Sequence, residues 1–183
     1  MWQKRRESKP DEERVIKEPD RARERTMHRA VKLLAAKPRS VGELRERLLE
    51  KNWTNRDIVD TVIEKLKEYK YLDDDQFARD VALSKLRQKP QGKRKLQQSL
   101  SQKKLSKETV QDAIKTAFEK IPETDLIDKA IEKRIRSTGK PETREDTKKF
   151  YDHLLRQGFD LDLIRSKLSA LSKKDLFGDV IAE

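Results

Sequence analysis

Residues 42–67 read GELRERLLEKNWTNRDIVDTVIEKLK, and the spacing of their apolar side chains decides the fold. The apolar positions follow one another at steps of four, five, five, four and four: Leu44, Leu48, Trp53, Ile58, Val62 and Leu66. Steps of four place side chains on one face of a helix, and two steps of five around Trp53 are what a turn between two helices produces. The stretch is therefore predicted to form a helix, a turn and a second helix.

The same spacing occurs three times along the chain. A shift of 52 residues gives a second set, which is Leu96, Leu100, Leu105, Val110, Ile114 and Phe118. A further shift of 54 gives a third set, which is Phe150, Leu154, Phe159, Ile164 and Leu168, and Ser172 breaks the pattern at the sixth place. An internal period of this length indicates tandem copies of one supersecondary unit.

Another helical segment precedes each copy. These segments lie at about residues 25–36, 75–88 and 124–136, and they are closed by KPRS, KPQG and TGKP, where proline and glycine stop a helix. Hydroxyl side chains stand where helix N-caps are wanted, at Ser40, Thr54, Ser106 and Thr143. We predict an all-α chain of three tandem three-helix repeats, helix-turn-helix-like, that form an elongated, curved, solenoid-like array.

The repeats set the expected domain limits. Repeat 1 is placed at residues 26–72, repeat 2 at 73–121 and repeat 3 at 122–173. Residues 1–25 mix nine basic with seven acidic side chains, and we expect a flexible, solvated tail whose last part is helical. Residues 174–183 are expected to form a C-terminal tail.

Several classes of protein are excluded or disfavoured by what the sequence lacks. It has no cysteine, so disulfides, thiolate zinc sites and cysteine nucleophiles are excluded. Its five glycines form no phosphate-binding or dinucleotide-binding loop. No stretch approaches the roughly 18 apolar residues of a membrane span. We expect a cytoplasmic protein that is not an enzyme, uses no cofactor and does not bind a membrane.

Three consecutive aspartates and two histidines are the candidates for a metal or catalytic site. Asp73, Asp74 and Asp75 could hold a metal, but they stand where a helix begins, and aspartate is favoured there as a cap and beside the helix dipole. His28 and His153 lie in different repeats, and neither has a second imidazole nearby in the sequence. The sequence therefore predicts no metal site and no catalytic residue.

The positive charge of the chain is concentrated in one stretch. The formal net charge is +11, and residues 81–107 contain no acidic side chain. Such a run favours contact with phosphates or with an acidic partner. No aromatic residue lies between residues 78 and 117, so contact with the phosphate backbone is favoured over base stacking. The predicted binding residues are Lys85, Arg87, Lys89, Lys93, Arg94, Lys95, Lys103 and Lys104.

Two other functions stay open at this point. A helix-turn-helix protein could insert its second helix into duplex DNA, although that helix in the first copy carries Asp57, Asp60, Glu64 and Glu68, which would face phosphates unfavourably. The chain could also be a helical scaffold that binds only proteins.

Three segments together resemble the RecX family of bacterial recombination regulators, over about residues 26–172. They are AVKLLAAKPRSVGELRERLLEKNW at 30–53, YLDDDQFARD at 71–80 and GKRKLQQSLSQKKLSKETVQDAI at 92–114. The junction motif, with Tyr71, Leu72, Asp73, Asp74, Phe77 and Ala78, is the most specific of them. The chain departs from the family pattern in KPQGKRK and in the acidic PETREDTKK.

The resemblance implies a role in DNA repair and the SOS response. It implies a monomer that binds along the groove of a RecA filament on single-stranded DNA and restrains strand exchange, ATP turnover and co-protease activity. It also suggests that Lys93, Arg94 and Lys95 approach the DNA or the filament. The sequence leaves open whether the effect is inhibition or stimulation, and whether the protein coats the groove or caps filament ends.

Overall fold

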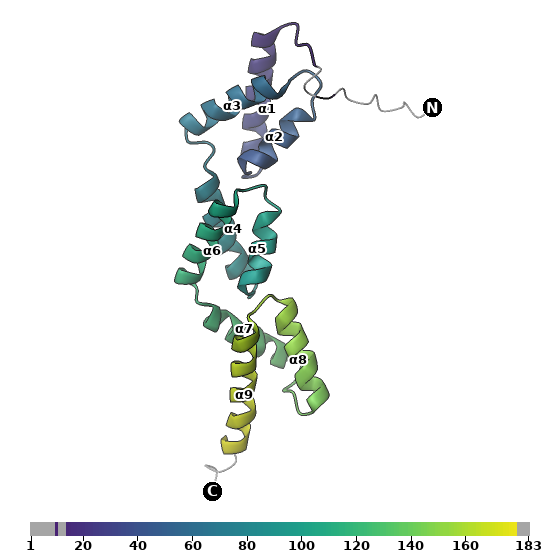
Figure 1. Ribbon diagram of the computed structural model, residues 1–183, viewed down its shortest axis with the longest axis vertical. Coiled ribbons are helices and arrows are strands. Elements are labelled where there is room, and N and C mark those ends of the chain that lie inside the picture. Colours follow the sequence, from purple (N-terminus) through teal and green to yellow (C-terminus); the bar gives the residue numbers. More distant parts are fainter. Residues whose placement is uncertain (1–9, 11–13, 179–183) are drawn as a thin grey trace, which may run out of the picture. The chain divides into compact units, whose positions relative to one another are not determined.

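The computed structural model describes residue 10 and residues 14–178, with side chains as far as residue 171. This part of the chain forms nine α-helices and no strand (Figure 1). The helices are α1 (Pro19–Ala36), α2 (Val41–Leu49), α3 (Arg56–Glu68), α4 (Asp74–Gln88), α5 (Lys93–Ser101), α6 (Lys107–Lys120), α7 (Glu123–Thr138), α8 (Arg144–Arg156) and α9 (Leu161–Gly178). The prediction of an all-α chain with three helices per repeat is confirmed, whereas the elongated, curved shape stays a prediction.

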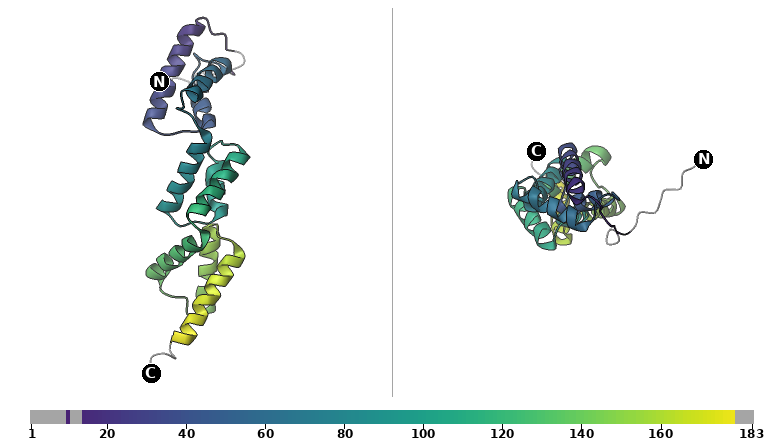
Figure 2. Two further views of the ribbon diagram at one scale, coloured as in Figure 1. Left: turned by 90° about the vertical axis from the view of Figure 1, so that its left-hand side faces the viewer. Right: turned by 90° about the horizontal axis from the view of Figure 1, so that it is seen from above.

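The helices belong to two compact units. The first comprises the described residues up to Ala78 together with Lys103–Ser106, and the second comprises Arg79–Gln102 together with the described residues from Lys107 onward. In the first unit α1, α2 and α3 pack against one another. In the second unit α5 packs on α6, and α7, α8 and α9 contact one another (Figure 2).

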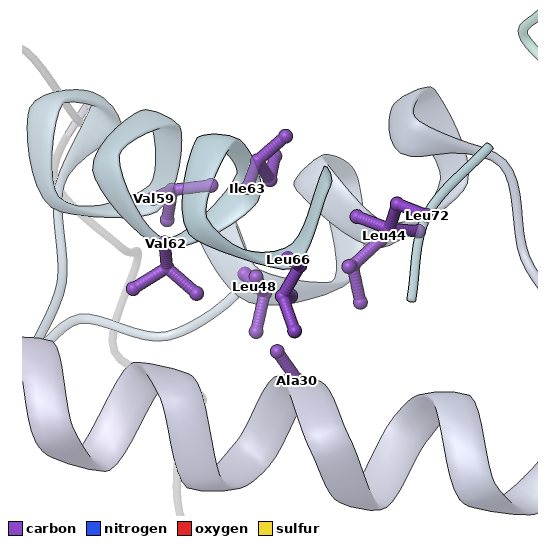
Figure 3. Packing of buried hydrophobic residues seen from close by; sticks show 8 residues of the cluster. All are labelled: Ala30, Leu44, Leu48, Val59, Val62, Ile63, Leu66 and Leu72. Atoms are coloured by element: carbon purple, nitrogen blue, oxygen red, sulfur yellow. The ribbon is translucent and has the colours of Figure 1, made fainter. Parts of the chain in front are cut away.

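The core of the first unit is made by the predicted apolar positions. Figure 3 shows Leu44 and Leu48 of α2 beside side chains of α3, above Ala30 of α1. The buried cluster consists of Ala30, Leu44, Leu48, Val59, Val62, Ile63, Leu66 and Leu72. Burial of each such aliphatic side chain stabilises the fold by about 1.5–3 kcal/mol relative to exposure. The small side chain of Ala30 lets the three helices approach closely.

The equivalent positions of the other repeats are buried as well. Those of repeat 2 are Leu96, Leu100, Val110 and Ile114, and those of repeat 3 are Phe150, Leu154, Phe159 and Ile164. Trp53 was predicted to be a core residue, and this is wrong: its side chain is half-buried. The guanidinium of Arg25 lies 4.4 Å from the centre of its ring, so one face of the indole is covered by a charged group and not by the core.

Helix ends follow side-chain capping, with one difference from the sequence prediction. Ser40 caps α2, and with Glu43 it forms a reciprocal capping box; Thr143 caps α8. The cap of α3 is Asn55 and not Thr54: the side-chain Oδ1 of Asn55 accepts a hydrogen bond from the N–H of Ile58, while Thr54 is fully buried. The hydroxyl of Thr54 instead accepts a hydrogen bond from that of Thr26.

The two predicted tails are partly helical. Helix α1 begins at Pro19, about six residues before the predicted start, and Ala22 is already buried. Helix α9 continues to Gly178. The remainder of both predicted tails, residues 1–9, 11–13 and 179–183, lies outside the described residues. The predicted domain limits stay predictions.

The segment before α1 contacts the turn between α2 and α3. One guanidinium nitrogen of Arg14 donates hydrogen bonds to the carbonyl oxygens of Leu49, Lys51 and Thr54, at 2.9, 3.0 and 3.2 Å. The last carbonyls of a helix have no partner inside the helix, so this side chain satisfies groups that would otherwise need water.

Candidate nucleic-acid interface

The eight predicted binding residues lie in both units. Lys85 and Arg87 are in the last turn of α4, Lys89 follows that helix, and Lys93, Arg94 and Lys95 open α5. All six belong to the second unit. Lys103 and Lys104 lie in the turn between α5 and α6, which belongs to the first unit.

Lys103 and Lys104 form ion pairs with α2. The ammonium of Lys103 lies 3.0 Å from a carboxylate oxygen of Glu43, and the two side chains are only 22% and 19% exposed. The ammonium of Lys104 lies 2.6 Å from a carboxylate oxygen of Glu46, and this ion pair lowers the pKa of Glu46 below its ordinary value. These lysines thus hold the α5–α6 turn against α2.

Lys95 is also engaged within the protein. Its ammonium donates to the side-chain carbonyl oxygen of Gln157 at 2.9 Å and approaches the main-chain carbonyl of Arg156 at 3.4 Å. Burial, and to a smaller extent the charge of Lys89, lowers the pKa of Lys95. The side chain points its charge at the C-terminal end of α8, where a cation is favoured.

The contacts of Lys103 and Lys95 occupy equivalent places in successive repeats. A shift of 52 converts Glu43 into Lys95, and a shift of 54 converts Lys103 into Gln157. Glu43 with Lys103 and Lys95 with Gln157 are therefore the same contact, once as an ion pair and once as a charged hydrogen bond. Both join the start of one repeat's second helix to the turn of the following repeat.

The backbone around these contacts is packed closely. The carbonyl of Lys103 accepts a hydrogen bond from the Ser40 hydroxyl, and the carbonyl of Gln157 accepts one from the N–H of Gly92 at 2.9 Å. A Cβ atom placed on Gly92 would lie 2.2 Å from the carbonyl oxygen of Gly158. The junction of repeats 2 and 3 therefore has no room for a side chain at residue 92, whereas the equivalent place in the first junction holds the Ser40 hydroxyl.

The junction role of Lys103 predicts a measurable coupling with Glu43. In a double-mutant cycle with Glu43→Gln and Lys103→Gln, we expect about 1 kcal/mol of coupling in the free energy of unfolding of the first unit, because the pair is largely shielded from water. Denaturant unfolding followed by Trp53 fluorescence in a Trp2→Phe background measures it. The exposed pair Glu46 and Lys104 is the control, and it should show a smaller coupling. Equal coupling for both pairs would contradict the junction role.

Four predicted residues remain as exposed cations near the start of α5. They are Arg87, Lys89, Lys93 and Arg94, called here the α4–α5 cations. Within the described residues none of their side chains forms an ion pair with a carboxylate. The ammonium of Lys93 lies 5.9 Å from the centre of the Phe118 ring. Lys85 is half-buried. The α4–α5 cations can therefore contact phosphates with little rearrangement.

The N-terminal end of α5 is itself occupied. A carboxylate oxygen of Glu123 accepts the N–H of Lys93 at 3.0 Å, and the carbonyl of Gly158 accepts the N–H of Arg94 at 3.2 Å. A helix N-terminus can bind a phosphate through such groups only when they are vacant. Contacts from this helix to phosphate would therefore be made by its side chains.

A second group of cations, which the sequence pattern does not indicate, lies near Lys89. Lys133 and Arg134 of α7 and His153 of α8 line a hollow of about 160 Å³ together with Lys89. Burial, and then the charges of Arg134, Arg156, Lys89 and Lys95, lower the pKa of His153 below its ordinary value. No spacing in the sequence connects these residues, because they come from three separate segments.

The aspartates before α4 have structural partners. Asp73 accepts the N–H of Gln76 at 2.8 Å, as a helix cap does, and Asp74 accepts the N–H of Val41 at 2.8 Å. Burial raises the pKa of Asp74 although this hydrogen bond opposes the shift. Over residues 10 and 14–178 no group of three or more potential ligands could hold a metal ion. In the same part of the chain no helix has the length and apolar character needed to cross a bilayer.

Comparisons with known proteins all lead to one family. Models of the first, second and third three-helix domains of RecX match residues 27–66, 73–114 and 122–168. The chain is 31% identical over 147 residues to "Regulatory protein RecX" of Prosthecochloris aestuarii, covering 80% of this chain and 93% of that one. It is 27% identical over 144 residues to the Bacillus subtilis protein of the same description, of which it covers 54%. The crystal structure of RecX from Lactobacillus salivarius has a similar fold, with a TM-score of 0.74 over 84% of this chain and 98% of that chain at 19% identity.

Proposed function

This chain belongs to the RecX family of regulatory proteins, and we propose that it binds the filament which a RecA-type recombinase forms on single-stranded DNA and restrains that filament's strand exchange, ATP turnover and co-protease activity. It acts as a monomer in the cytoplasm, by occupying the filament and not by catalysis. Homologues are named regulatory proteins, which supports the regulatory part of the proposal.

One observation carries the DNA-binding part of the proposal. The α4–α5 cations are four exposed positive side chains within eight residues, and they have no carboxylate partner in the described part of the chain. Each phosphate that such a side chain neutralises releases condensed counterions, which favours binding at low salt. A group of this kind recognises a backbone of phosphates whatever its sequence.

The alternative of sequence-specific duplex binding is less well supported. In α3, the second helix of the first helix-turn-helix pair, Asp57, Glu64 and Glu68 are exposed, and Asp60 is paired with Arg45 at 2.8 Å. A recognition helix with this face would place carboxylates against the phosphates that flank the major groove. A sequence-dependent footprint on duplex DNA would reverse this preference.

The direct test is a titration of recombinase activity. Adding the protein to the cognate recombinase on single-stranded DNA is expected to lower the rate of DNA-dependent ATP hydrolysis and the yield of strand exchange, with saturation at a fixed ratio of protein to filament. Unchanged rates at saturating protein would end the proposal. Binding to the recombinase with equal affinity in the absence of DNA would favour a protein scaffold instead.

A further inference from the structure

The hollow between α7, α8 and the segment before α5 has an unusual chemical lining. Its volume is about 160 Å³, and the polar groups around it come from Lys89, Lys133, Arg134, Ser137, His153 and Gln157. No carboxylate is among its lining residues. Apolar contact comes from Pro90 and Ala130 at its wall. A small hollow that is lined by three cationic side chains and by no carboxylate is suited to an anion.

The helical register explains why these side chains meet. Residues three and four apart lie on one face of a helix, so Lys133 and Ser137 of α7 share a face. His153 of α8 and Gln157, which follows the last residue of α8, share a face in the same way. α7 packs against α8, which brings the two faces together. Lys89 enters from the segment that connects α4 to α5.

Hydrogen-bond capacity is left over in the hollow. The Nε of Arg134 is buried and has no hydrogen-bond partner among the described residues, while its guanidinium lies 5.9 Å from the Phe150 ring. The side-chain oxygen of Gln157 already accepts a hydrogen bond from Lys95, which leaves its N–H groups as donors. The Ser137 hydroxyl already donates its hydrogen to the main-chain carbonyl of Arg134, so it has none left for a ligand.

The charges that face His153 are all positive. They are Lys89 before α5, Lys95 of α5, Arg134 of α7 and Arg156 of α8, and with burial they lower the pKa of the imidazole. Several cations close together without a carboxylate repel one another, so an anion placed among them would be strongly attracted.

We propose that this α7–α8 hollow binds one phosphate group of single-stranded DNA, with Lys89, Lys133 and Arg134 supplying positive charge and Gln157 and His153 supplying hydrogen-bond donors. Lys89 belongs both to the hollow and to the α4–α5 cations, so the bound backbone continues from one to the other. The lining would suit a free oxyanion as well as a backbone phosphate, because the two share the same chemistry. The choice of a DNA phosphate therefore rests on the proposed function.

The two histidines of the chain allow a direct test by NMR. The imidazole signals of the full-length protein are followed against pH, alone and with sulfate, an oligothymidylate or poly-glutamate. A bound anion opposes the charges around His153, so the oligothymidylate is expected to raise the pKa of His153 by about one unit, which is a tenfold change in proton affinity. His28 is exposed on α1 in the first unit, outside the hollow, and its imidazole signals serve as the internal control.

Each other outcome of the titration overturns the proposal. If the oligothymidylate does not raise the pKa of His153, no DNA phosphate binds in the hollow. A response to sulfate with none to the oligothymidylate assigns the hollow to a free oxyanion. A response to poly-glutamate as large as that to DNA assigns it to acidic protein side chains.

A matched pair of variants distinguishes a phosphate contact in the hollow from an effect of the protein's net charge. Lys133→Gln is expected to lower the slope of log affinity for oligothymidylate against log salt by about 0.7, the value for one single-strand phosphate contact. Lys129→Gln removes the same charge one turn earlier on α7, outside the hollow, and should leave the slope unchanged. Equal slopes for the two variants would refute the assignment.

The experiments test the proposed function and the phosphate site in the hollow separately, so either proposal can fail while the other stands. If both variants bind DNA alike but still restrain the recombinase, the hollow is wrong and the function stands. If His153 responds to DNA while the native protein leaves the recombinase unaffected, the hollow stands and the function is wrong.

Discussion

Replacing Gly158 by alanine is expected to lower the free energy of unfolding of the second unit by about 3 kcal/mol. The residue has a φ of +85°, which an L-residue with a side chain adopts only at a cost. A Cβ atom there would also lie 2.4 Å from the main-chain nitrogen of Lys95 and 2.7 Å from its Cβ. Both are main-chain or near-main-chain atoms, so α5 itself must move, and the junction of repeats 2 and 3 opens.

Gly139 supplies the control for this substitution. Its φ of +80° is nearly the same, but a Cβ atom there would meet nothing within 4 Å. Gly139→Ala therefore carries only the backbone cost, about 2 kcal/mol, because residues with a side chain rarely adopt its φ of 80° and ψ of 173°. Urea unfolding followed by circular dichroism measures both variants. If the two alanines destabilise the protein equally, the close approach at the junction does not contribute to stability.

Neutralising the four α4–α5 cations is expected to weaken binding of single-stranded DNA roughly 100-fold at physiological salt. The variant is Arg87→Gln, Lys89→Gln, Lys93→Gln and Arg94→Gln in one chain. Each lost phosphate contact lowers the salt slope by about 0.7, so four together lower it by about three. Fluorescence anisotropy of a labelled oligothymidylate over a range of salt concentrations gives both quantities, and the recombinase ATPase assay reports the effect on the filament.

Four lysines of the first unit provide a control with the same change in net charge. Lys32, Lys37, Lys65 and Lys70 are all exposed, and their replacement by glutamine should leave the salt slope nearly unchanged. If both fourfold variants lose affinity to the same extent, the binding arises from the total charge of the protein and has no defined site.

The repeat structure could be predicted from the sequence because each apolar position acts locally. Leu44 and Leu48 are one turn apart on one helix, so their spacing alone indicates that they share a buried face. Thr54 and Trp53 were misjudged because they lie in a turn, where exposure depends on which segment packs there. The side chains of Arg14 and Arg25 decide that environment, and neither is one of the repeating apolar positions.

The roles of individual lysines could not be predicted in the same way. Lys93 and Lys95 are two residues apart in one basic run, yet one is exposed and the other is tied to Gln157, 62 positions later. The distinction follows from the junction between repeats, which brings together residues about 60 positions apart, and the spacing of apolar residues within one helix does not indicate such contacts. The cationic lining around His153 has the same origin, since it joins residues from the segment before α5, from α7 and from α8.

Arg14 takes at the first repeat the place that a serine hydroxyl takes at the second. A shift of 52 places Lys51 where Lys103 stands in the next repeat, and both main-chain carbonyls receive a side-chain hydrogen bond: from Ser40 at Lys103, and from Arg14 at Lys51. The first repeat thus has its upstream docking point filled by its own chain. A chain without the Arg14 guanidinium would leave the carbonyls of Leu49, Lys51 and Thr54 to be satisfied by water, so the entry of the chain into its first repeat is held by one side chain.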